Sequence, residues 1–228
     1  MVTDEDKISI IIPCLDEAAG IRGCLERLQE IRAAGHEVIV VDGGSKDNTL
    51  ELCQGLADSI IQSPRGRAQQ LNAGSKVAKG CVLLFLHADT ILPDDALAII
   101  EQVAKGSVCW GRFDVRLSGR HFMFRLIETL MNFRSRFTGV ATGDQAIFIF
   151  SSLFHQVGGF PDIALMEDIS ICSKLRKACW PVCIKSPVTT SSRRWENGGI
   201  IRTMMLMHFL RLRFALGADP AKLAKAYE

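Results

Sequence analysis

Short segments of the chain place carboxylates where they could bind a ligand. Asp42 closes the apolar run EVIVVD and is followed by Gly43 and Gly44. A carboxylate there can accept hydrogen bonds from a ribose or a base, and glycines let the backbone approach a ligand closely. The alternative is a turn in which Asp42 caps the following helix. The segment by itself leaves both interpretations open.

A second carboxylate follows the apolar run CVLLFLH, in the segment His87-Ala88-Asp89-Thr90. At the end of a buried strand, Asp89 could hold a divalent cation beside a diphosphate. The alternative is a turn that leads into a helix at Pro93, and it is the better explanation for the neighbouring Asp94 and Asp95. For Asp89 we favour the metal-binding interpretation.

Two later clusters also carry chemistry. Glu167 and Asp168 open a helix after an apolar loop, where they could act as a general base with a neighbouring acid. A structural role is the alternative, because a helix dipole stabilises acids at its N-terminus. Arg193, Arg194 and Trp195 could neutralise a departing phosphate. The alternative here is a solvated turn with Trp195 packed into the core.

The elements that must position these residues alternate between strand and helix in the first half of the chain. Apolar runs typical of strands buried on both faces are expected at 8–13, 37–42, 59–62 and 81–87. Helices are expected at 17–33, 45–57, 68–79 and 93–105, with Ser45 as a cap. This alternation predicts a parallel three-layer α/β sheet, whose ligands bind at the carboxyl ends of the strands.

The second half of the chain alternates less regularly. Extended segments are expected at 108–117, 145–150 and 181–191, and helices at 122–137, from 151 or 152, at 167–178, after 196 and from 220. A loop over 138–144 and a turn at 158–161 separate them. No linker or repeat divides the sequence, so we expect one domain over 1–228. Its parts are two halves, about 1–107 and 108–196, and a C-terminal helical segment, about 197–228.

Composition and charge exclude some classes of function. The chain has 228 residues, 48% of them hydrophobic, and a net charge of +2, as in a folded globular protein. A general nucleic-acid binder would be clearly basic, so we expect no nucleic-acid partner. Residues 185–228 carry eight Lys/Arg against three Asp/Glu, while the remaining residues carry 19 against 22. The acidic N-terminus and the short or Arg-interrupted apolar runs argue against a signal peptide and a membrane span, so we expect a cytoplasmic protein.

Six segments, in order, resemble the motifs of family 2 glycosyltransferases. IIPCLDE at 11–17 is similar to IPxxNE, VDGGSKDNT at 41–49 to VDDGSxDxT, and GRAQQLNAG at 66–74 to a helix entry with a basic residue. HADT at 87–90 stands at the DxD position, MEDI at 166–169 at the ED motif, and RRW at 193–195 at the end of QxxRW. Together with GDQA at 143–146, the pattern further resembles a subfamily associated with radical-SAM and selenoprotein-like gene clusters and linked to arsenosugar synthesis.

The resemblance implies a fold and a reaction. The fold would be a GT-A-type three-layer α/β/α sandwich with a mostly parallel central sheet. Its Rossmann-like half, about 1–107, would bind the nucleotide sugar, and the half at about 108–196 would hold the acceptor and the catalytic base. The reaction would move one sugar from a UDP- or GDP-linked donor to an unknown acceptor hydroxyl with inversion. A divalent cation, Mn²⁺ or Mg²⁺, would offset charge on the leaving nucleoside diphosphate.

The resemblance also implies roles for individual residues. Asp168 would be the base, with Glu167 beside it, and Asp89 would hold the metal. Arg194 and Trp195 would close over the diphosphate. The other residues expected to bind the nucleotide sugar are Pro13, Leu15, Glu17, Asp42, Gly44, Arg67, His87 and Ala88. Gly143 and Asp144 are expected on the acceptor side.

Three positions depart from the family pattern. Asp16 replaces an Asn, and His87 replaces the first Asp of DxD, which leaves one carboxylate for the metal unless His87 ligates it. Ser191 stands where the Gln of QxxRW would be, which favours one sugar per turnover over processive synthesis. Two other functions stay open. One is a sugar-nucleotide nucleotidyltransferase, although PCLDEAAG supplies no glycine-rich loop with a basic residue. The other is a non-catalytic nucleotide-binding or membrane-surface scaffold protein.

Two helices have apolar sides that need a partner. In the predicted helix 122–137, one side holds Phe122, Leu126, Leu130, Phe133 and Phe137, and the opposite side is polar. The simpler interpretation is that the apolar side covers the sheet, and the alternative is a surface that meets lipid or a lipid-linked acceptor. The C-terminal helix carries two apolar stripes. One can dock on the domain, and we expect the other to contact the inner face of a membrane or a second subunit.

Overall fold

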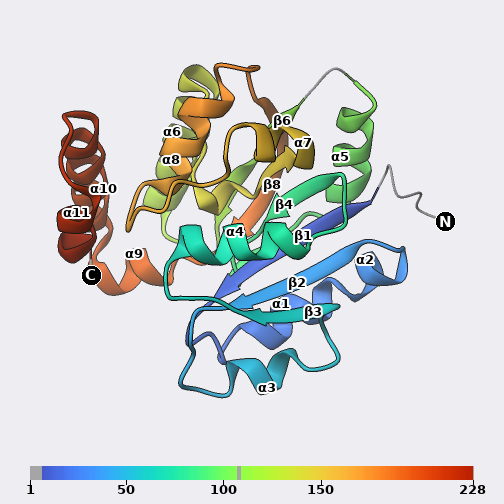
Figure 1. Cartoon of the computed structure of the whole chain (residues 1–228). Coiled ribbons are helices and arrows are strands. Elements are labelled where there is room, and N and C mark those ends of the chain that lie inside the picture. Colours follow the sequence, from blue (N-terminus) through green and yellow to red (C-terminus); the bar gives the residue numbers. More distant parts are fainter. Residues whose placement is uncertain (1–6, 107–108, 228) are drawn as a thin grey trace.

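A single sheet organises the chain in the computed structural model, which describes residues 7–106 and 109–227. Within those residues the sheet has eight strands in the order β3-β2-β1-β4-β7-β6-β8-β5 (Figure 1). The first four strands along the chain pair in parallel: β1 (Ile8–Cys14), β2 (Glu37–Asp42), β3 (Ser59–Gln62) and β4 (Val82–Phe85). The predicted α/β class with a parallel nucleotide-binding-type half is confirmed.

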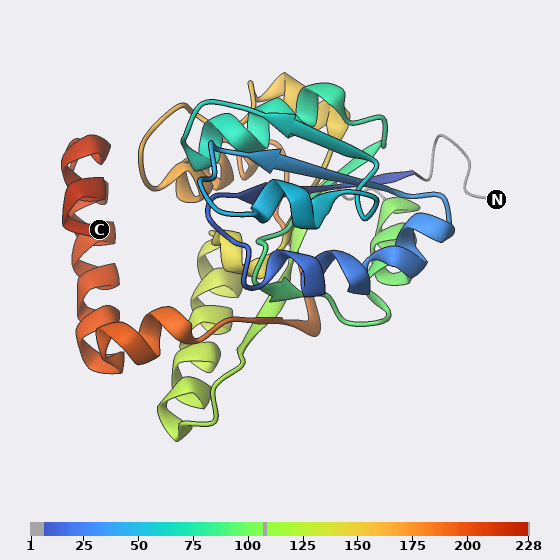
Figure 2. The same cartoon turned by 90° about the horizontal axis from the view of Figure 1, so that it is seen from below.

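Helices cover both faces of this half because its strands are apolar on both sides. Ile10 and Ile12 pack in one core with α1 (Ile21–Arg27), α3 (Thr49–Cys53) and α5 (Ala96–Ala104). Ile11, which points the other way, packs in a second core with α4 (Arg67–Val77), α7 (Ser151–Gln156) and α8 (Glu167–Leu175). Figure 2 shows α4 and α7 on one side of the sheet and α1 on the other. The three-layer prediction therefore holds.

The remaining strands make the sheet mixed. β7 (Ile147–Phe150) runs antiparallel to β4 and to β6 (Trp110–Leu117), while β6 runs parallel to β8 (Val182–Thr190). β5 (Thr90–Ile91) adds an antiparallel edge to β8. The sequence analysis predicted no strand here and gave a turn only as an alternative. The pairing could not be seen locally, since Thr90 pairs with Thr190, one hundred positions away.

Several predicted boundaries differ from the structure. The helix expected over 17–33 begins at Ile21 and is interrupted at Leu28, after which α2 (Gln29–Ala33) continues. Ser45 caps no helix, because its hydroxyl donates to Asp42, and α3 begins only at Thr49. The strand expected from Val108 is seen from Trp110, and Val108 itself lies outside the described residues. The division of the single domain into functional halves stays a prediction.

Helix α6 (Phe122–Thr138) packs on β6 through the side that carries its polar residues, where Phe124 and Ile127 are also buried. The Asn132 amide accepts from the Val115 N–H (2.9 Å) and donates to the Val115 carbonyl (3.0 Å). The Leu117 N–H donates to Glu128, and Arg125 donates to the Leu117 carbonyl. These side chains supply the backbone partners that a further strand beside β6 would have supplied.

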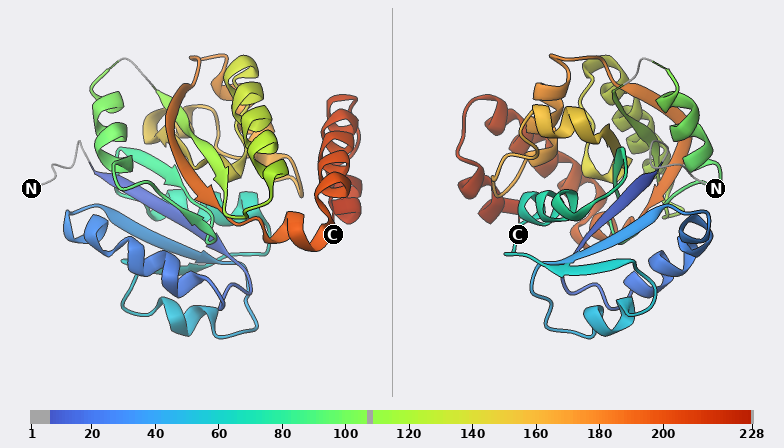
Figure 3. Two further views of the ribbon diagram at one scale, coloured as in Figure 1. Left: turned by 180° about the vertical axis from the view of Figure 1, so that it is seen from behind. Right: turned by 45° about the vertical axis from the view of Figure 1, so that its right-hand side comes forward.

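The apolar side of α6 consequently faces outward, and the interpretation that it covers the sheet is wrong. Phe122 and Phe137 are 74% and 77% exposed, and Leu126, Leu130 and Phe133 are exposed as well. Figure 3 shows α6 lying along the sheet on the side of β6 and β8. We call these five residues the α6 stripe.

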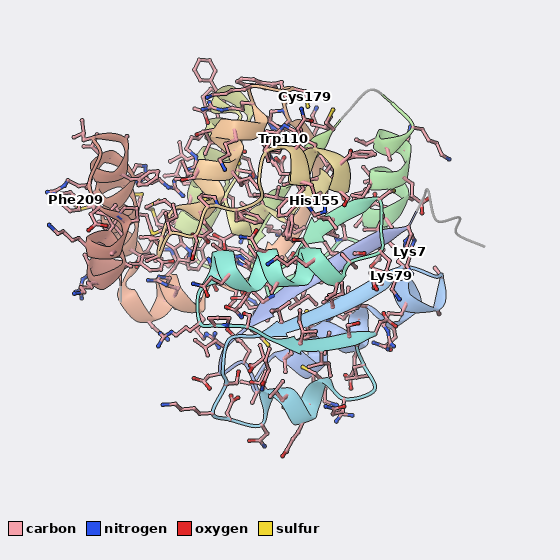
Figure 4. The ribbon with its side chains drawn as sticks, viewed as in Figure 1. Lys7, Lys79, Trp110, His155, Cys179 and Phe209 are labelled. Atoms are coloured by element: carbon pink, nitrogen blue, oxygen red, sulfur yellow. The ribbon has the colours of Figure 1, made fainter. Side chains whose placement is uncertain are left out.

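A helical hairpin follows the short helix α9 (Arg193–Gly198). Within it, α10 (Ile200–Ala215) and α11 (Pro220–Tyr227) pack together beside the sheet (Figures 1 and 2). Leu210 and Leu223 are buried against Met166, at the start of α8. One apolar stripe of α10, which includes Leu210, docks on the domain as predicted. The other stripe is exposed: Ile201, Met205, Phe209 and Leu212. Figure 4 shows Phe209 at the outer edge of the molecule. No helix in residues 7–106 and 109–227 is long and apolar enough to cross a membrane.

Candidate active site

Asp42 lies at the carboxyl end of β2 and is fully buried. Its carboxylate accepts from the Gly44 N–H (3.0 Å), the Ser45 N–H (3.1 Å) and the Ser45 hydroxyl. Gly44 has a φ of +92°, which suits glycine, and a Cβ at Gly43 would lie 3.0 Å from the Gln70 amide carbon. These hydrogen bonds form a turn, but Asp42 does not cap the following helix, whose N-cap residue is Asn48. Its contact with a nucleoside stays a prediction.

Glu17 and Asp89 form one acidic cluster at neighbouring strand ends. The Glu17 N–H donates to the Thr49 hydroxyl (2.9 Å), and Glu17 Oε2 lies 3.7 Å from Arg193 Nη2. Burial raises the pKa of Glu17, Arg193 opposes this shift, and the negative charge of Asp89 adds to it. Asp89 is exposed just after β4. The cluster therefore offers carboxylates to a cation or a polar ligand at the surface.

The side chains near Asp89 fit a cation whose coordination shell is completed by a bound substrate. Within the described parts of the chain, no group of three or more His, Cys, Asp or Glu side chains could hold a metal ion. His87 is engaged elsewhere, because its Nδ1 lies 3.3 Å from Asp144 Oδ1. Mg²⁺ commonly binds through one or two carboxylates together with substrate phosphates and water. Asp89 alone suits that mode of binding.

Asp168 is fixed at the N-terminus of α8 by two backbone groups. Its Oδ2 accepts from the Gly143 N–H (3.1 Å), and its Oδ1 accepts from the Ile169 N–H (2.7 Å). The segment expected as a loop over 138–144 includes the last residue of α6 and leads into a 3₁₀ helix, Gly143–Gln145. A Cβ at Gly143 would overlap the His87 ring, so glycine allows this close approach. Asp168, Gly143 and His87 are therefore brought together.

The pKa values of Asp144 and Glu167 shift in opposite directions at this site. Burial acts to raise the pKa of Asp144, but the hydrogen bond and charge of His87 hold it below its usual value. Burial raises the pKa of Glu167, and the charge of Asp168 adds to this shift while Arg67 opposes it. The Nε of Arg67 lies 4.0 Å from Glu167 Oε1. Neighbouring carboxyls with separated pKa values are common at catalytic sites.

The backbone is strained next to two of the predicted site residues and at the end of the 3₁₀ helix that contains two others. Among the described residues, positive φ values outside glycine occur only at Asp16 (+53°), Ala146 (+43°) and Met166 (+70°). They adjoin Glu17, the 3₁₀ helix at Gly143 and Glu167. Such conformations cost about 1–3 kcal/mol each and cluster at functional sites.

A small cavity joins residues from four of the segments singled out in the sequence. Its predicted members are Arg67, His87, Gly143, Glu167 and Asp168. Leu71, Phe85, Ile147 and Phe160 complete the lining. Pro13, Leu15 and Ala88 lie at the ends of β1 and β4 on the same edge of the sheet. These residues therefore lie at the edge where the sequence predicts a binding site, and binding there stays a prediction.

Arg194 and Trp195 have different surroundings from those expected. Trp195 packs with Leu117 and Phe124, as in the alternative interpretation of this segment. Arg194 Nη2 donates to the Tyr227 carbonyl (2.7 Å), and its guanidinium carbon lies 3.4 Å from the centre of the Tyr227 ring. Arg194 therefore contacts the C-terminal end of α11 in this structure.

Two arginines at this site were missed by the sequence analysis. Arg134 comes from α6 and Arg211 from α10. Burial lowers the pKa of Arg134 to about 10, the charge of Arg211 adds to the shift, and the carboxylate of Asp168 opposes it. Burial also lowers the pKa of Arg211, against Asp168 and Asp144. Only the packing of α6, α8 and α10 brings these groups together, and no local motif marks them.

The fold resembles those of nucleotide-sugar transferases with solved structures. A mannosyltransferase from Pyrobaculum calidifontis, in complex with GDP-mannose and Mn²⁺, matches with a TM-score of 0.66 at 21% identity, over 99% of this chain and 71% of that one. TarS 1–349 from S. aureus, in complex with UDP-GlcNAc, matches with a TM-score of 0.63 at 18% identity, over 81% of this chain and 58% of that one. These likenesses confirm the GT-A fold.

Comparison of sequences gives the family. A poly-beta-1,6-N-acetyl-D-glucosamine synthase of Staphylococcus aureus is 31% identical over 101 residues, which are 42% of this chain and 24% of the synthase. A PGL/p-HBAD biosynthesis glycosyltransferase of Mycobacterium bovis is 36% identical over 98 residues, 40% of this chain and 38% of that enzyme. The matched regions thus span well under half the length of these curated relatives. The family model described as Glycosyl transferase family 2 matches residues 9–157, more than half of the sequence. The chain therefore belongs to glycosyl transferase family 2.

Proposed function

We propose that the chain moves one sugar from a UDP- or GDP-linked donor to an acceptor hydroxyl, with inversion at the anomeric carbon. Family membership and neighbours bound to GDP-mannose or UDP-GlcNAc support a nucleotide-sugar donor. The same findings favour glycosyl transfer over nucleotidyl transfer and over a non-catalytic scaffold. Membership of the arsenosugar-linked subfamily is part of the proposal and rests on the HADT, GDQA and LMEDI segments.

The proposed mechanism assigns the base to Asp168. Two backbone N–H groups fix its carboxylate beside the 3₁₀ helix Gly143–Gln145, where the acceptor would lie. There it would take the proton of the acceptor hydroxyl as that oxygen attacks the anomeric carbon. Attack from the side opposite the diphosphate inverts the configuration. The hydrogen bond from Gly143 to Asp168 is the observation that carries this assignment, because it ties the base to the acceptor side.

The donor would lie across the ends of β1, β2 and β4. Asp89 would hold a Mn²⁺ or Mg²⁺ ion, and Glu17 and Arg193 lie close to Asp89. When bound, the ion would supply positive charge that stabilises the departing diphosphate. Arg194 would reach the same diphosphate once Tyr227 moves from its guanidinium.

Release of nucleoside diphosphate from a panel of nucleotide sugars, with and without Mn²⁺ or Mg²⁺, tests this function. In Asp168→Asn, nucleotide affinity should stay unchanged while transfer falls at least about 100-fold, because the amide cannot accept the proton. Asp162→Asn is the matched control, since Asp162 is an exposed acid that accepts a hydrogen bond from Gln69. Transfer that survives Asp168→Asn at the control rate would remove Asp168 as the base.

We also propose that the exposed stripes of α6 and α10 contact a membrane surface or a second subunit. Support comes from their exposure and from the excess of Lys/Arg over Asp/Glu in residues 185–228. Vesicle co-sedimentation and solution mass should both be measured for the wild type and for Phe133→Ser with Phe209→Ser. The variant should lose whichever association the wild type shows. A wild type that is monomeric and stays in the supernatant would refute the proposal.

A further inference from the structure

The exposed apolar stripes of α6 and α10 meet at the first turns of the two helices. A groove of about 380 Å³ lies there between His121 and Met123 on one side and residues 199–202 on the other. The Phe122 ring stacks on the His121 ring, with 4.8 Å between the ring centres, so the α6 stripe begins at this groove. Ile201 lines the same groove, so the exposed stripe of α10 begins there too. We call that second set the α10 stripe: Ile201, Met205, Phe209 and Leu212.

The inward sides of both helices are already used by the domain. Ile200 and Met204 of α10 pack against a buried cluster that contains Phe124 and Ile127 of α6. The outward sides stay uncovered, since even Leu126, the least exposed member of the two stripes, is 50% exposed. Connected apolar patches of this kind mark interaction sites on native proteins, whereas single exposed apolar residues do not. The two stripes and the groove therefore form one docking surface.

The charged side chains around this surface have one sign. Residues 197–218 contain no Asp or Glu, and Glu128 is the only acid in residues 115–143, where it is buried and ion-paired. Glu196 and Asp219 flank the first of these stretches, and both accept hydrogen bonds within their own turns. The exposed basic side chains next to the stripes are Arg120, His121, Arg202, His208 and Arg213. A partner that complements this surface is therefore anionic as well as apolar.

A second copy of this chain would not supply that negative charge. In a two-fold symmetric dimer the same surface meets itself, so Arg202 and Arg213 would face the same basic residues of the other copy. A bilayer with anionic headgroups offers both components, hydrocarbon for the stripes and phosphate for the arginines. The guanidinium carbon of Arg213 lies 5.8 Å from the centre of the Phe209 ring, so a cation and an aromatic ring stand together as they would at the boundary between headgroups and acyl chains.

We propose that the α6 and α10 stripes dock on a bilayer that contains anionic phospholipids. This inference rests on the proposed contact of the stripes with a membrane or a second subunit, and it commits to the membrane. On its inward side α10 packs through Leu210 against Met166, next to Glu167. Docking would therefore hold the start of α8 about one helix diameter, roughly 10 Å, from the membrane surface.

Co-sedimentation of the full chain with vesicles tests the choice of partner. The wild type should pellet with vesicles of phosphatidylglycerol and phosphatidylcholine at low salt and stay in the supernatant with phosphatidylcholine alone. Added salt should weaken the binding, because it screens the arginines from the headgroups. Arg202→Gln should lower the partition coefficient about fivefold. Arg27→Gln is the matched control, since Arg27 is an exposed arginine of α1, which lies away from α6 and α10 (Figure 1).

The apolar part of the contact is tested at the groove. Phe122→Ser with Ile201→Ser should lower the partition coefficient at least about tenfold, because two large side chains no longer enter the hydrocarbon. Val77→Ser is the matched control, since Val77 is a 41% exposed apolar residue at the end of α4. Both replaced side chains are exposed, so urea midpoints should stay at the wild-type value. A double variant that binds as well as Val77→Ser would overturn the proposal.

Solution mass and transfer separate this inference from the proposals on which it builds. The wild type should be a monomer in the absence of vesicles. A wild type that dimerises and ignores the vesicles would overturn docking on a membrane and leave the wider proposal of association standing. Equal binding to neutral and anionic vesicles would overturn the requirement for anionic lipid. Release of nucleoside diphosphate is measured without vesicles, so its failure in a chain that binds anionic vesicles would contradict glycosyl transfer and leave the docking surface intact.

Discussion

Asn132 offers a sharp test of why α6 turns its polar side to the sheet. Its amide bonds to both the N–H and the carbonyl of Val115, on the side of β6 that has no neighbouring strand at that residue. Leucine has the same number of side-chain heavy atoms as asparagine and the same branching at Cγ, and it favours helix by a few tenths of a kcal/mol. Asn132→Leu would therefore suit an ordinary amphipathic helix and harm only one that pairs with a strand.

The expected cost follows from the two backbone groups of Val115. Each is left without a partner in a partly buried position, and each costs about 1–3 kcal/mol. Some water can enter beside the half-buried helix, so we expect a loss of about 2–4 kcal/mol in the free energy of unfolding. Gln145, whose amide lies 3.5 Å from Asn132 Oδ1, also loses a contact.

Urea unfolding followed by circular dichroism measures this loss. The control is Leu130→Asn, which places the same amide on the exposed side of α6, where Leu130 is 51% exposed. We expect the control to change stability by under about 1 kcal/mol, mainly through helix propensity. If α6 instead packed by its apolar side, Leu130→Asn would lower the free energy of unfolding more than Asn132→Leu. A stable Asn132→Leu beside a destabilised Leu130→Asn would therefore refute the hydrogen-bonded packing of α6.

Three further predictions concern the site and the pH dependence of stability. Tyr227→Ala removes the ring over Arg194, so nucleoside diphosphate affinity should rise by about two- to tenfold in calorimetry, and a fall would mean that Tyr227 supports the donor site. Gly143→Ala should push the His87 ring aside and lower transfer at least about tenfold; unchanged transfer would show that this close packing is dispensable. Burial lowers the pKa of His36, whose Nδ1 accepts from the Ile8 N–H. As the pH falls below about 6.5, His36 therefore becomes protonated in the unfolded chain before it does in the folded chain. Stability should then fall from pH 7 to pH 5, and the fall should be smaller in His36→Gln; equal falls in urea midpoints would exclude His36 as a cause.

Local sequence was sufficient to predict the strands of the first half. Glu37–Asp42 and Ser59–Gln62 have the predicted bounds, because their apolar runs are ended by turn residues and buried on a helix-covered sheet. Parallel topology brings the carboxyl ends of the strands to one edge of the sheet, so Asp42 and Asp89 lie on the edge that the sequence predicts. Ligand binding at that edge stays a prediction. What each carboxylate does there depends on nearby groups. Ser45, for instance, was expected to cap a helix and instead donates to Asp42.

The orientation of α6 could not be predicted from its own pattern. Its apolar and polar sides were assigned correctly, but the side that faces the sheet depends on β6, whose residues from Asp114 to Leu117 pair with β8 on one edge and meet α6 on the other. The residue pattern of α6 does not show that one edge of β6 lacks a strand partner. The presence of Asn132 and Glu128 among the polar residues is informative only once that edge is known.

The two sides of the site differ in how the chain encodes them. The proposed donor residues Glu17, Asp42 and Asp89 lie at or soon after the ends of β1, β2 and β4, so each is placed by the strand before it. The proposed base is placed differently, because Asp168 at the start of α8 is held by the backbone of Gly143, 25 positions earlier in the sequence. The family model matches residues 9–157 and ends before Asp168. The contact between Gly143 and Asp168 therefore depends on how α8 packs, which the sequence pattern of the matched region does not specify.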